Sequence, residues 1–434
     1  MRNAANGTAF AVPAREGHIE EEKDIYEMMR RKAKGLEQEL TEFAAALVRT
    51  PSRTLDEGNV AALVDEAMRR LGYDEVSRDD YGNVVGVIFG RESKPTLLLN
   101  SHMDTAPAGD LSEWTMDPHS AVVADGRLHG LGAADCKGGL AAQVYAGALL
   151  KRALLPFRGN LVVAATVGQE EGHSLGVRKL MQETLPAMEI KPSYAILGDP
   201  TDLGLYYGHD GWVELEIYVE GPDPFQIDDA ADAVCELIVG HCGSAPRWSR
   251  EPETLSLRGL HFQEAHGRKR AVLSVERRLL EAEPVEAAIN ELKQAASMAA
   301  KIAGGAGVGV EIRQGTRTCY TGRITEVRHI TSAWSINPYD PLVERARDAL
   351  RAAGVAARVG RWRLGRLGMG TAGDVFVNDF ATPAIGYGPG NEEVCHRPNE
   401  YLEISKLAGA LYGTAVIAQS LIGYPVFGWT SEDI

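Results

Sequence analysis

The chain has 434 residues, of which 44% are hydrophobic and 24% are charged, and this composition is typical of a globular protein. A single hydrophobic core rarely extends over so long a chain, so we expect two domains. The 45 basic and 60 acidic residues give a net charge of −15, which argues against nucleic acid or an anionic membrane as a partner.

The cysteines and the apolar runs bear on the cellular compartment. Five cysteines are scattered along the chain without a C-x-x-C pair, which favours a reducing compartment over a disulfide framework or a zinc–thiolate site. No apolar run is as long as a membrane-spanning helix requires, and the N-terminus lacks the apolar stretch of a signal peptide. We therefore expect a cytoplasmic protein, with residues 1–22 as a loose N-terminal arm.

The first half of the chain alternates between helical and strand patterns. Apolar residues recur at helical spacing from near Lys23 onward and predict two helices. Their apolar faces contain Leu36, Leu40, Phe43 and Leu47 in the first helix and Val60, Leu63, Ala67 and Leu71 in the second. Continuous apolar runs at 83–89, 96–100 and 161–167 predict buried strands, and the alanine-rich segment 138–150 predicts a helix. This order indicates a mixed α/β sheet covered on both faces.

The pattern changes near Tyr206. Residues 212–220 alternate between apolar and polar side chains, as a half-exposed antiparallel strand does. Helical and strand patterns up to Arg313 give the order βαββαβ, which is that of a ferredoxin-like sandwich. The α/β pattern then returns, and Asp340–Pro341 predicts the start of a helix. We predict a large α/β domain at 23–207 and 321–434, with a small α+β module inserted at 208–320.

Glu170 and Glu171 are adjacent and follow a predicted buried strand. Two neighbouring carboxylates repel each other, and a divalent cation beside them would relieve that repulsion. An isolated pair of this kind is more often a solvated part of a loop, so its interpretation depends on the rest of the chain.

Further polar residues follow other strand patterns. His102 and Asp104 stand in LLLNSHMDT, Asp135 in GLGAADCKGG, Asp199 in YAILGDPT, and His396 in GPGNEEVCHRPNEY. Each alone has an ordinary explanation as a turn, cap or loop residue. Together, at strand ends where open α/β sheets bind ligands, they offer imidazoles and carboxylates that suit Zn²⁺ first, with Co²⁺ or Mn²⁺ as alternatives. Two metal ions that share Asp135 would form a clamp for a hydrolytic water.

In their order and spacing, these motifs resemble those of the M20 metallopeptidase family, which includes acetylornithine deacetylase, succinyl-diaminopimelate desuccinylase and carboxypeptidase G2. The resemblance extends from about Leu36 to the C-terminus. It implies a zinc-peptidase-like catalytic domain with a mixed sheet. It also implies that the inserted module is the family's ferredoxin-like lid and dimerisation domain.

The resemblance implies a role for each site residue. Asp135 would bridge two divalent metal ions. The residues that complete the two metal sites would be His102 with Asp199, and Glu171 with His396. Asp104 would support His102, and Glu170 would be the general base. Arg278 in SVERRLL would bind a substrate carboxylate, a task that suits a bidentate guanidinium.

The inserted module departs from the family pattern. Family members often carry a lid histidine that stabilises the developing oxyanion, and Phe225 stands at that place in a shortened loop. The loss of such a donor costs about 10²–10³ in rate. His209 and His241 are possible substitutes. Asp199 stands where the deacylases often have glutamate, and this favours a peptide substrate.

Two cysteines lie beside presumed ligands, Cys136 after Asp135 and Cys395 before His396. Neighbours in sequence usually point in different directions. We therefore expect both cysteines to be small buried residues and not ligands.

Together these features predict a hydrolase that cleaves an amide bond of a small carboxylated substrate, an N-acyl amino acid or a dipeptide. Metal-activated water would attack, with Glu170 as the general base. The expected partners are the small substrate and a second copy of the chain, bound through the lid domain as a homodimer. One alternative is a non-hydrolytic metal-binding or scaffolding homologue, which Phe225 supports. Another is a hydrolase of a ureido or cyclic C–N bond.

Overall fold

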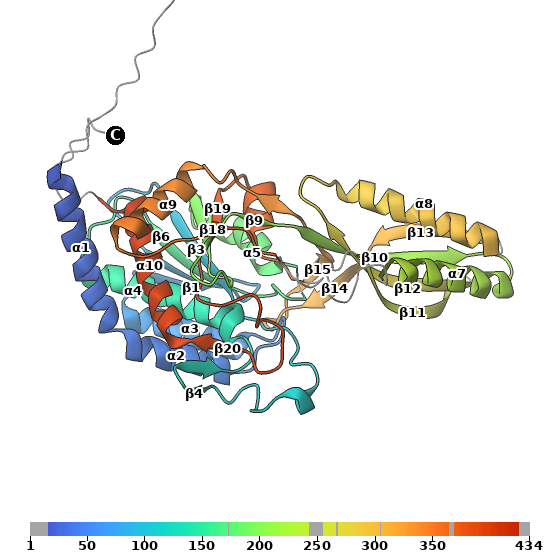
Figure 1. Ribbon diagram of the computed structural model, residues 1–434, viewed down its shortest axis with the longest axis horizontal. Helices are drawn as coiled ribbons and strands as arrows, with labels where there is room; N and C mark the ends of the chain where they lie inside the picture. Colours follow the sequence, from blue (N-terminus) through green and yellow to red (C-terminus); the bar gives the residue numbers. More distant parts are fainter. Residues whose placement is uncertain are drawn as a thin grey trace, which may run out of the picture.

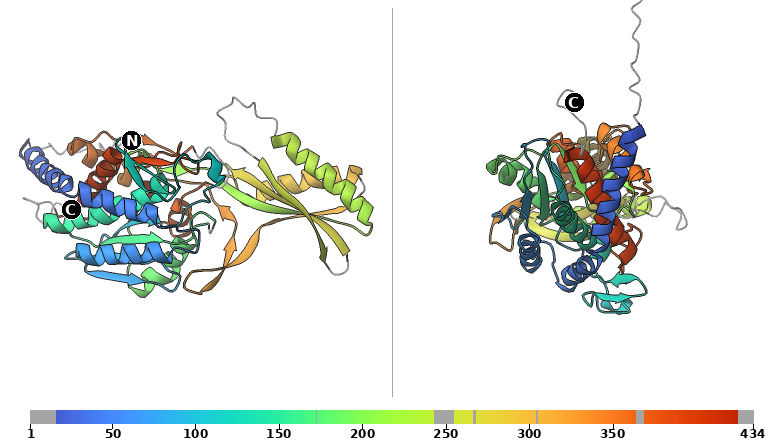
Figure 2. Two further views of the ribbon diagram at one scale, coloured as in Figure 1. Left: turned by 90° about the horizontal axis from the view of Figure 1, so that it is seen from below. Right: turned by 90° about the vertical axis from the view of Figure 1, so that its left-hand side faces the viewer.

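The computed structural model describes residues 16–171, 173–242, 255–265, 268–303, 305–363 and 369–424. Two bodies follow each other along its long axis (Figure 1), a large α/β body and a smaller body built from residues in the middle of the chain. The smaller body projects from one end of the larger one (Figure 2). Within the described ranges, no helix combines the length and the apolar character needed to cross a bilayer.

An eight-stranded mixed sheet organises the large body, in the order β1-β2-β6-β3-β7-β19-β8-β18. The strands are β1 (Glu75–Arg78), β2 (Val84–Ile88), β3 (Leu97–His102), β6 (Leu161–Thr166), β7 (Tyr194–Leu197), β8 (Leu205–Tyr206), β18 (Val359–Gly360) and β19 (Ala384–Gly386). At the centre, β3 pairs in parallel with both β6 and β7. The carboxyl ends of these three strands therefore meet at one edge of the sheet.

Apolar cores lie on both faces of this sheet. The helices are α1 (Glu16–Lys34), α2 (Glu37–Arg49), α3 (Gly58–Leu71), α4 (Gly138–Ala153), α5 (Leu175–Lys179), α6 (Leu185–Ala187), α9 (Pro341–Ala352) and α10 (Ile404–Ile422). Leu97 and Leu99 of β3 belong to the core formed with α4 and α10. Leu98, between them, belongs to a second core with Leu180 and Phe376. Because successive strand residues point to opposite faces, the continuous apolar run of β3 is buried on both sides, as its sequence predicts.

A second, antiparallel sheet forms the smaller body, in the order β11-β12-β10-β13 with β16 paired to β10. The elements are β10 (Gly211–Glu220), α7 (Pro224–Cys242), β11 (Leu255–Ala265), β12 (Arg268–Leu279), α8 (Val285–Ala303), β13 (Gly307–Ile312) and β16 (Ile330–Thr331). The order along the chain from β10 to β13 is βαββαβ, as predicted. Val213, Leu215, Ile217 and Val219 of β10 pack with α7 and α8 in one core, so the intervening residues of β10 face the other side of the sheet.

A hairpin of β14 (Gln314–Thr318) and β15 (Ile324–Arg328) links the two bodies. At its tip, the Tyr320 hydroxyl donates to the Gly82 carbonyl at 2.9 Å, and the Thr321 hydroxyl donates to the Asp80 carbonyl at 2.7 Å. The sequence pattern did not predict this hairpin, and the predicted domain boundary at residue 320 falls inside it.

Two segments at the ends of the chain differ from the prediction. Helix α1 begins at Glu16, so residues 16–22 are helical instead of part of a loose arm, and residues 1–15 lie outside the described part. Helix α10 is 19 residues long, where the pattern predicts only apolar segments. Apolar residues lie on most faces of this helix, because it is buried and packs against α4.

Short strands complete the fold. β4 (Val122–Ala124), β5 (Arg127–His129) and β20 (Tyr401–Glu403) form a small sheet, and β9 (Gly208–His209) pairs with β17 (Trp334–Ser335). The β5–β20 pairing brings the segment that precedes α10 close to the turn that precedes α4. That approach places the histidine motif of the C-terminal part beside the Asp135 motif.

Candidate metal centre

His102 and Asp104 lie at the carboxyl end of β3, the central strand. His102 is its last residue and is 3% exposed. Its Nδ1 lies 2.9 Å from the carbonyl oxygen of Asp104 and 3.4 Å from the Oδ1 atom of the same residue. With the proton on Nδ1, the Nε2 atom is available as a ligand.

Asp135 lies between two histidines. It belongs to the tight turn Ala133–Lys137 in front of α4. Its Oδ1 atom lies 3.1 Å from Nε2 of His102, and its Oδ2 atom lies 3.3 Å from Nε2 of His396. One carboxylate therefore contacts both histidines, with one oxygen for each.

Glu170 contacts His396, the second of the two histidines beside Asp135. It follows β6, the neighbour of β3 in the sheet, and its Oε1 atom lies 3.1 Å from Nε2 of His396. Asp135, Glu170 and His396 each offer a ligand atom, and these atoms lie within 4.8 Å of one another. The fold thus brings together residues that are far apart in sequence.

Asp199 is buried at the carboxyl end of β7, with an exposed fraction of 4%. Burial raises the pKa of its carboxyl to about 7, an effect that His102 opposes and the Asp135 carboxylate increases. The neighbouring backbone is close-packed, because a Cβ atom on Gly139 of α4 would lie 1.9 Å from the carbonyl oxygen of Gly198. Asp199 therefore lies close enough to the centre to interact electrostatically with its members.

Glu171 is placed differently from its neighbour. Its side chain is exposed, and its backbone N–H donates to Oγ1 of Thr54 at 3.2 Å. Among the described residues, its carboxylate belongs to none of the groups whose ligand atoms converge. Of the adjacent pair, only Glu170 reaches the histidine.

Cys136 points toward the centre, which corrects the expectation that it points away from the ligands. Cys136, Asp135 and His102 offer ligand atoms that lie within 4.8 Å of one another. Burial raises the pKa of the Cys136 thiol, while His102 opposes that effect. Cys136 and Cys395 are both buried and free, as predicted.

The electrostatics of the centre favour a bound cation. Burial disfavours the charged form of His396, but the carboxylates of Glu170 and Asp135 outweigh burial and raise its pKa well above the usual value. Burial also opposes ionisation of Asp135, but His102 and His396 outweigh it and lower the pKa of that carboxyl. Protons on the histidines thus balance the carboxylates, and a divalent cation would take the place of those protons. The imidazole and carboxylate donors fit Zn²⁺.

The Asp104 carboxylate joins the histidine to the glutamate loop. It is fully buried, with an exposed fraction of 0%. Its Oδ1 atom accepts the N–H of Gln169 at 3.0 Å, and its Oδ2 atom accepts the N–H of Glu170 at 2.9 Å and the hydroxyl of Thr54 at 2.7 Å. Asp104 therefore holds His102 and the Glu170 backbone in one network.

Three other residues of this network were not predicted, namely Thr54, Glu57 and Glu400. Oε1 of Glu57 accepts the N–H of Gly168 at 2.9 Å, just before the glutamate pair. Oε1 of Glu400 accepts the N–H of Asp135 at 3.2 Å. Glu400 stands in the same motif as the C-terminal histidine, which could have indicated it. The segment that contains Thr54 and Glu57 carries no comparable signal.

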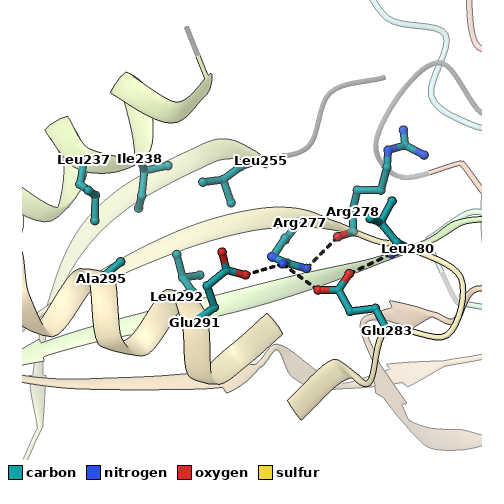
Figure 3. Close-up of a pocket in the computed structure, with 10 residues that line it drawn as sticks. All are labelled: Leu237, Ile238, Leu255, Arg277, Arg278, Leu280, Glu283, Glu291, Leu292 and Ala295. Atoms are coloured by element: carbon teal, nitrogen blue, oxygen red, sulfur yellow. Dashed lines mark hydrogen bonds and ion pairs between the residues drawn. The ribbon is translucent and has the colours of Figure 1, made fainter. Parts of the chain in front are cut away.

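Arg278 lies where the smaller body meets the larger one. In the register of β10 and β12 it is opposite Trp212, and it is 6% exposed. Its neighbour Arg277 turns into a cavity of about 290 Å³ between α7, α8 and β12, where it pairs with Glu283 at 2.8 Å and Glu291 at 2.7 Å. Figure 3 shows the two arginine side chains pointing away from each other. Arg278 therefore belongs to the helix-free face of the sheet.

The proposed substitutes for the lid histidine have different outcomes. Nδ1 of His209 lies 2.7 Å from the Asp210 carbonyl oxygen, and its Nε2 accepts the N–H of Thr371 at 2.9 Å. Both ring nitrogens are engaged, so His209 does not offer a donor to a substrate. The side chain of His241 lies outside the described residues. Phe225 is 80% exposed near the start of α7.

Comparison with known families identifies relatives over most of the chain. A model of peptidase family M20/M25/M40 matches residues 98–421. The uncharacterized protein YgeY of Escherichia coli K12 is 26% identical over 388 residues, which cover 86% of this chain and 92% of that protein. Succinyl-diaminopimelate desuccinylase 2 of Ruegeria sp. TM1040 is 28% identical over 232 residues, which cover 50% of this chain and 58% of that protein.

Solved structures share the fold. The dipeptidase Dug1p of Saccharomyces cerevisiae aligns with a TM-score of 0.68 at 16% identity, over 91% of this chain and 98% of that chain. The YxeP protein of Bacillus subtilis, a dinuclear metal-binding peptidase of the M20 family, aligns with a TM-score of 0.63 at 16% identity, over 89% of this chain and 98% of that chain. At such identities the likeness concerns the fold.

We predict that Asp104→Ala weakens metal binding at the centre. The change removes the acceptor of two loop N–H groups and the group that orients His102. The loss of such a supporting residue lowers metal affinity by about 10–100-fold, which competition with a Zn²⁺ chelator would measure. Asp110→Ala, on the exposed loop after the same strand, is the control and should leave the affinity unchanged. Equal affinities for the two variants would contradict this role of Asp104.

We predict that Glu57 makes the metal-free protein less stable as the pH rises. Burial and, to a smaller extent, the Asp104 carboxylate raise the pKa of its carboxyl from 4.5 to about 8. Because the folded chain holds the proton more tightly than the unfolded chain, the free energy of unfolding falls between these two pH values. Glu57→Gln keeps an acceptor for the Gly168 N–H and cannot ionise, so part of the fall should disappear. Urea unfolding of both proteins at several pH values tests this, and parallel pH profiles would refute it.

Proposed function

The chain belongs to peptidase family M20/M25/M40, and we propose that the amide bond it cleaves lies in an N-acyl amino acid or a dipeptide with a free carboxylate. The observation that carries this proposal is the Asp135 carboxylate, which contacts His102 with one oxygen and His396 with the other. A carboxylate in that position can hold two cations side by side. The metal-dependent hydrolase activity of the family needs such an arrangement.

We propose that the centre holds two metal ions. The donors fit Zn²⁺ best, and the same donor set also accepts Co²⁺ and Mn²⁺. His102 and Asp199 would hold one ion, His396 and Glu171 the other, and Asp135 both. The contacts of Asp135 and the burial of Asp199 support this assignment. Glu171 would have to turn inward from its exposed position.

Divalent ions, when bound, supply Lewis acidity that polarises the amide carbonyl and acidifies a hydrolytic water. Glu170 is our candidate for the base that takes the water's proton and delivers it to the leaving amine. Its carboxylate lies at the centre, 3.1 Å from His396, while its backbone N–H is fixed by Asp104. A general base needs this combination of reach and fixed orientation.

The smaller body is our candidate for the substrate-binding lid and the homodimer interface. Arg278 lies on its helix-free face, at the end nearest the larger body. A guanidinium there can form two parallel hydrogen bonds with a substrate carboxylate. Strand β11 lies at the edge of the second sheet, and an edge strand can pair with the same strand of another copy. The four cysteines whose side chains the structure describes are free, which supports our placement in the cytoplasm.

We predict that the two adjacent glutamates can be separated by substitution. Glu170→Gln keeps the shape but cannot accept a proton, so kcat should fall by about 10²–10⁴-fold while the metal content stays unchanged. Glu171→Gln should lose about one zinc ion per chain. Elemental analysis gives the metal content, and hydrolysis of an acyl-amino-acid and dipeptide panel gives the rate.

Two outcomes would count against this assignment. Metal loss in Glu170→Gln with full metal in Glu171→Gln would exchange the roles of the two residues. Wild-type protein with bound zinc that hydrolyses no member of the panel, and behaves like Glu170→Gln, would overturn the proposed substrate class.

We predict that Arg278 acts through the substrate carboxylate. Arg278→Lys keeps the charge but loses the bidentate geometry, so KM for carboxylated substrates should rise by about 10-fold or more, as expected for ~1.4 kcal/mol of binding. Carboxamide analogues of the same substrates should show no such increase. Arg277→Lys is the matched control, since Arg277 faces the other side of the strand. Equal effects on both substrate classes would show that Arg278 has only a structural role.

A further inference from the structure

A second group of ligand-type side chains lies where the smaller body joins the larger one. His173, Glu214 and His329 each offer a ligand atom, and these atoms lie within 4.8 Å of one another. The three residues come from the loop after Glu171, from β10 and from the segment between β15 and β16. None of them belongs to the centre around Asp135.

His173 is buried without the contacts that an imidazole usually makes. It is 4% exposed, and neither Nδ1 nor Nε2 has a hydrogen-bond partner among the described residues. Its ring packs against the ring of Trp212, with centroids 4.9 Å apart, and against the ring of His329, with centroids 4.6 Å apart. A buried polar group without a partner destabilises the folded state, so a ligand that binds the ring would stabilise the fold.

Glu214 and His329 are fixed relative to each other by the backbone. The Glu214 N–H donates to the His329 carbonyl at 2.9 Å. Nδ1 of the buried His329 lies 3.0 Å from Oε2 of Glu214, although the two atoms lack hydrogen-bond geometry. The carboxylate and the ring are therefore close together without fully satisfying each other.

We propose that His173, Glu214 and His329 form a further metal site, separate from the two-ion centre, that binds Zn²⁺ or a similar borderline cation. Two imidazoles and one carboxylate are a common set of three protein ligands for zinc. Ligand atoms around a tetrahedral zinc ion lie about 3.4 Å apart, so the observed group needs only a small contraction. A cation would also give one of the two ring nitrogens of His173 a partner.

Arg313 provides the competing explanation. Its Nη1 atom lies 2.6 Å from Oε2 of Glu214, so the carboxylate already has one positive partner. That guanidinium is 42% exposed on its side chain and can move into solvent at little cost. Arg313 forms no hydrogen bond with His173 among the described residues. The ion pair with Glu214 therefore does not explain why the His173 ring is buried without partners.

The position of this site gives the ion a structural role. The chain enters the smaller body through β10, which contains Glu214, and leaves it past His329, between β15 and β16. His173 lies just beyond the glutamate pair. An ion bound by all three residues would connect the loop that carries Glu170 and Glu171 to the end of the smaller body that adjoins the larger one.

Zinc content of four proteins tests the proposal. Wild-type protein should bind about three ions per chain, Asp135→Asn about one, Glu214→Gln about two, and the double variant none. Circular dichroism establishes that each variant is folded. Co²⁺ in place of Zn²⁺ on Asp135→Asn should give visible d–d absorption that disappears in the Glu214→Gln background.

Two control variants separate a metal site from an ion-pair network. Glu216→Gln changes the same charge two residues along the same face of β10 and should keep the full metal content. Arg313→Ala removes the competing cation, so it should tighten zinc binding to Asp135→Asn by about 10-fold or more. Wild type with two ions and Asp135→Asn with none would overturn this site while leaving the two-ion centre intact. Wild-type protein that contains no zinc would count against both the proposed third site and the two-ion centre.

Discussion

The buried Asp104 carboxylate is the interaction on which the candidate centre depends. A carboxylate without solvent is costly unless donors surround it, and here two loop N–H groups, the Thr54 hydroxyl and the His102 ring face it. The parallel pairing of β3 with β6 places the histidine and the glutamate loop at the same edge of the sheet. Asp104 converts that approximate proximity into a fixed geometry.

The turn that carries Asp135 is held independently from both of its sides. The Glu400 carboxylate accepts the Asp135 N–H, and Lys137 donates to the Thr50 carbonyl at 2.7 Å, at the end of α2. Lys137 is fully buried, and burial lowers its pKa to about 7. Residues from the first helices and from the C-terminal part thus determine where this one carboxylate lies.

Much of the fold and of the centre could be predicted from the sequence, because the information was local. Continuous apolar strands such as β3, the alternation in β10 and the residues His102, Asp135, Glu170 and His396 are all visible in short segments. The β14–β15 hairpin and the role of Glu57 depend instead on contacts between distant segments. Whether a sequence neighbour such as Cys136 points toward the ligands depends on backbone geometry in one turn, which no periodicity reveals.

The contacts at the tip of the β14–β15 hairpin restrict which chimeras between related proteins can fold when the smaller body is replaced. The Tyr320 ring occupies the space over Gly82, where a Cβ atom would lie 2.3 Å from that ring. A tyrosine at this place in the hairpin and a glycine in the loop before β2 therefore form one complementary pair, although they lie far apart in sequence. A chimera that replaces the inserted module but cuts the chain near residue 320 would separate the two strands of the hairpin. Recombination that preserves the fold would have to transfer the entire hairpin together with a matching small residue in the recipient loop.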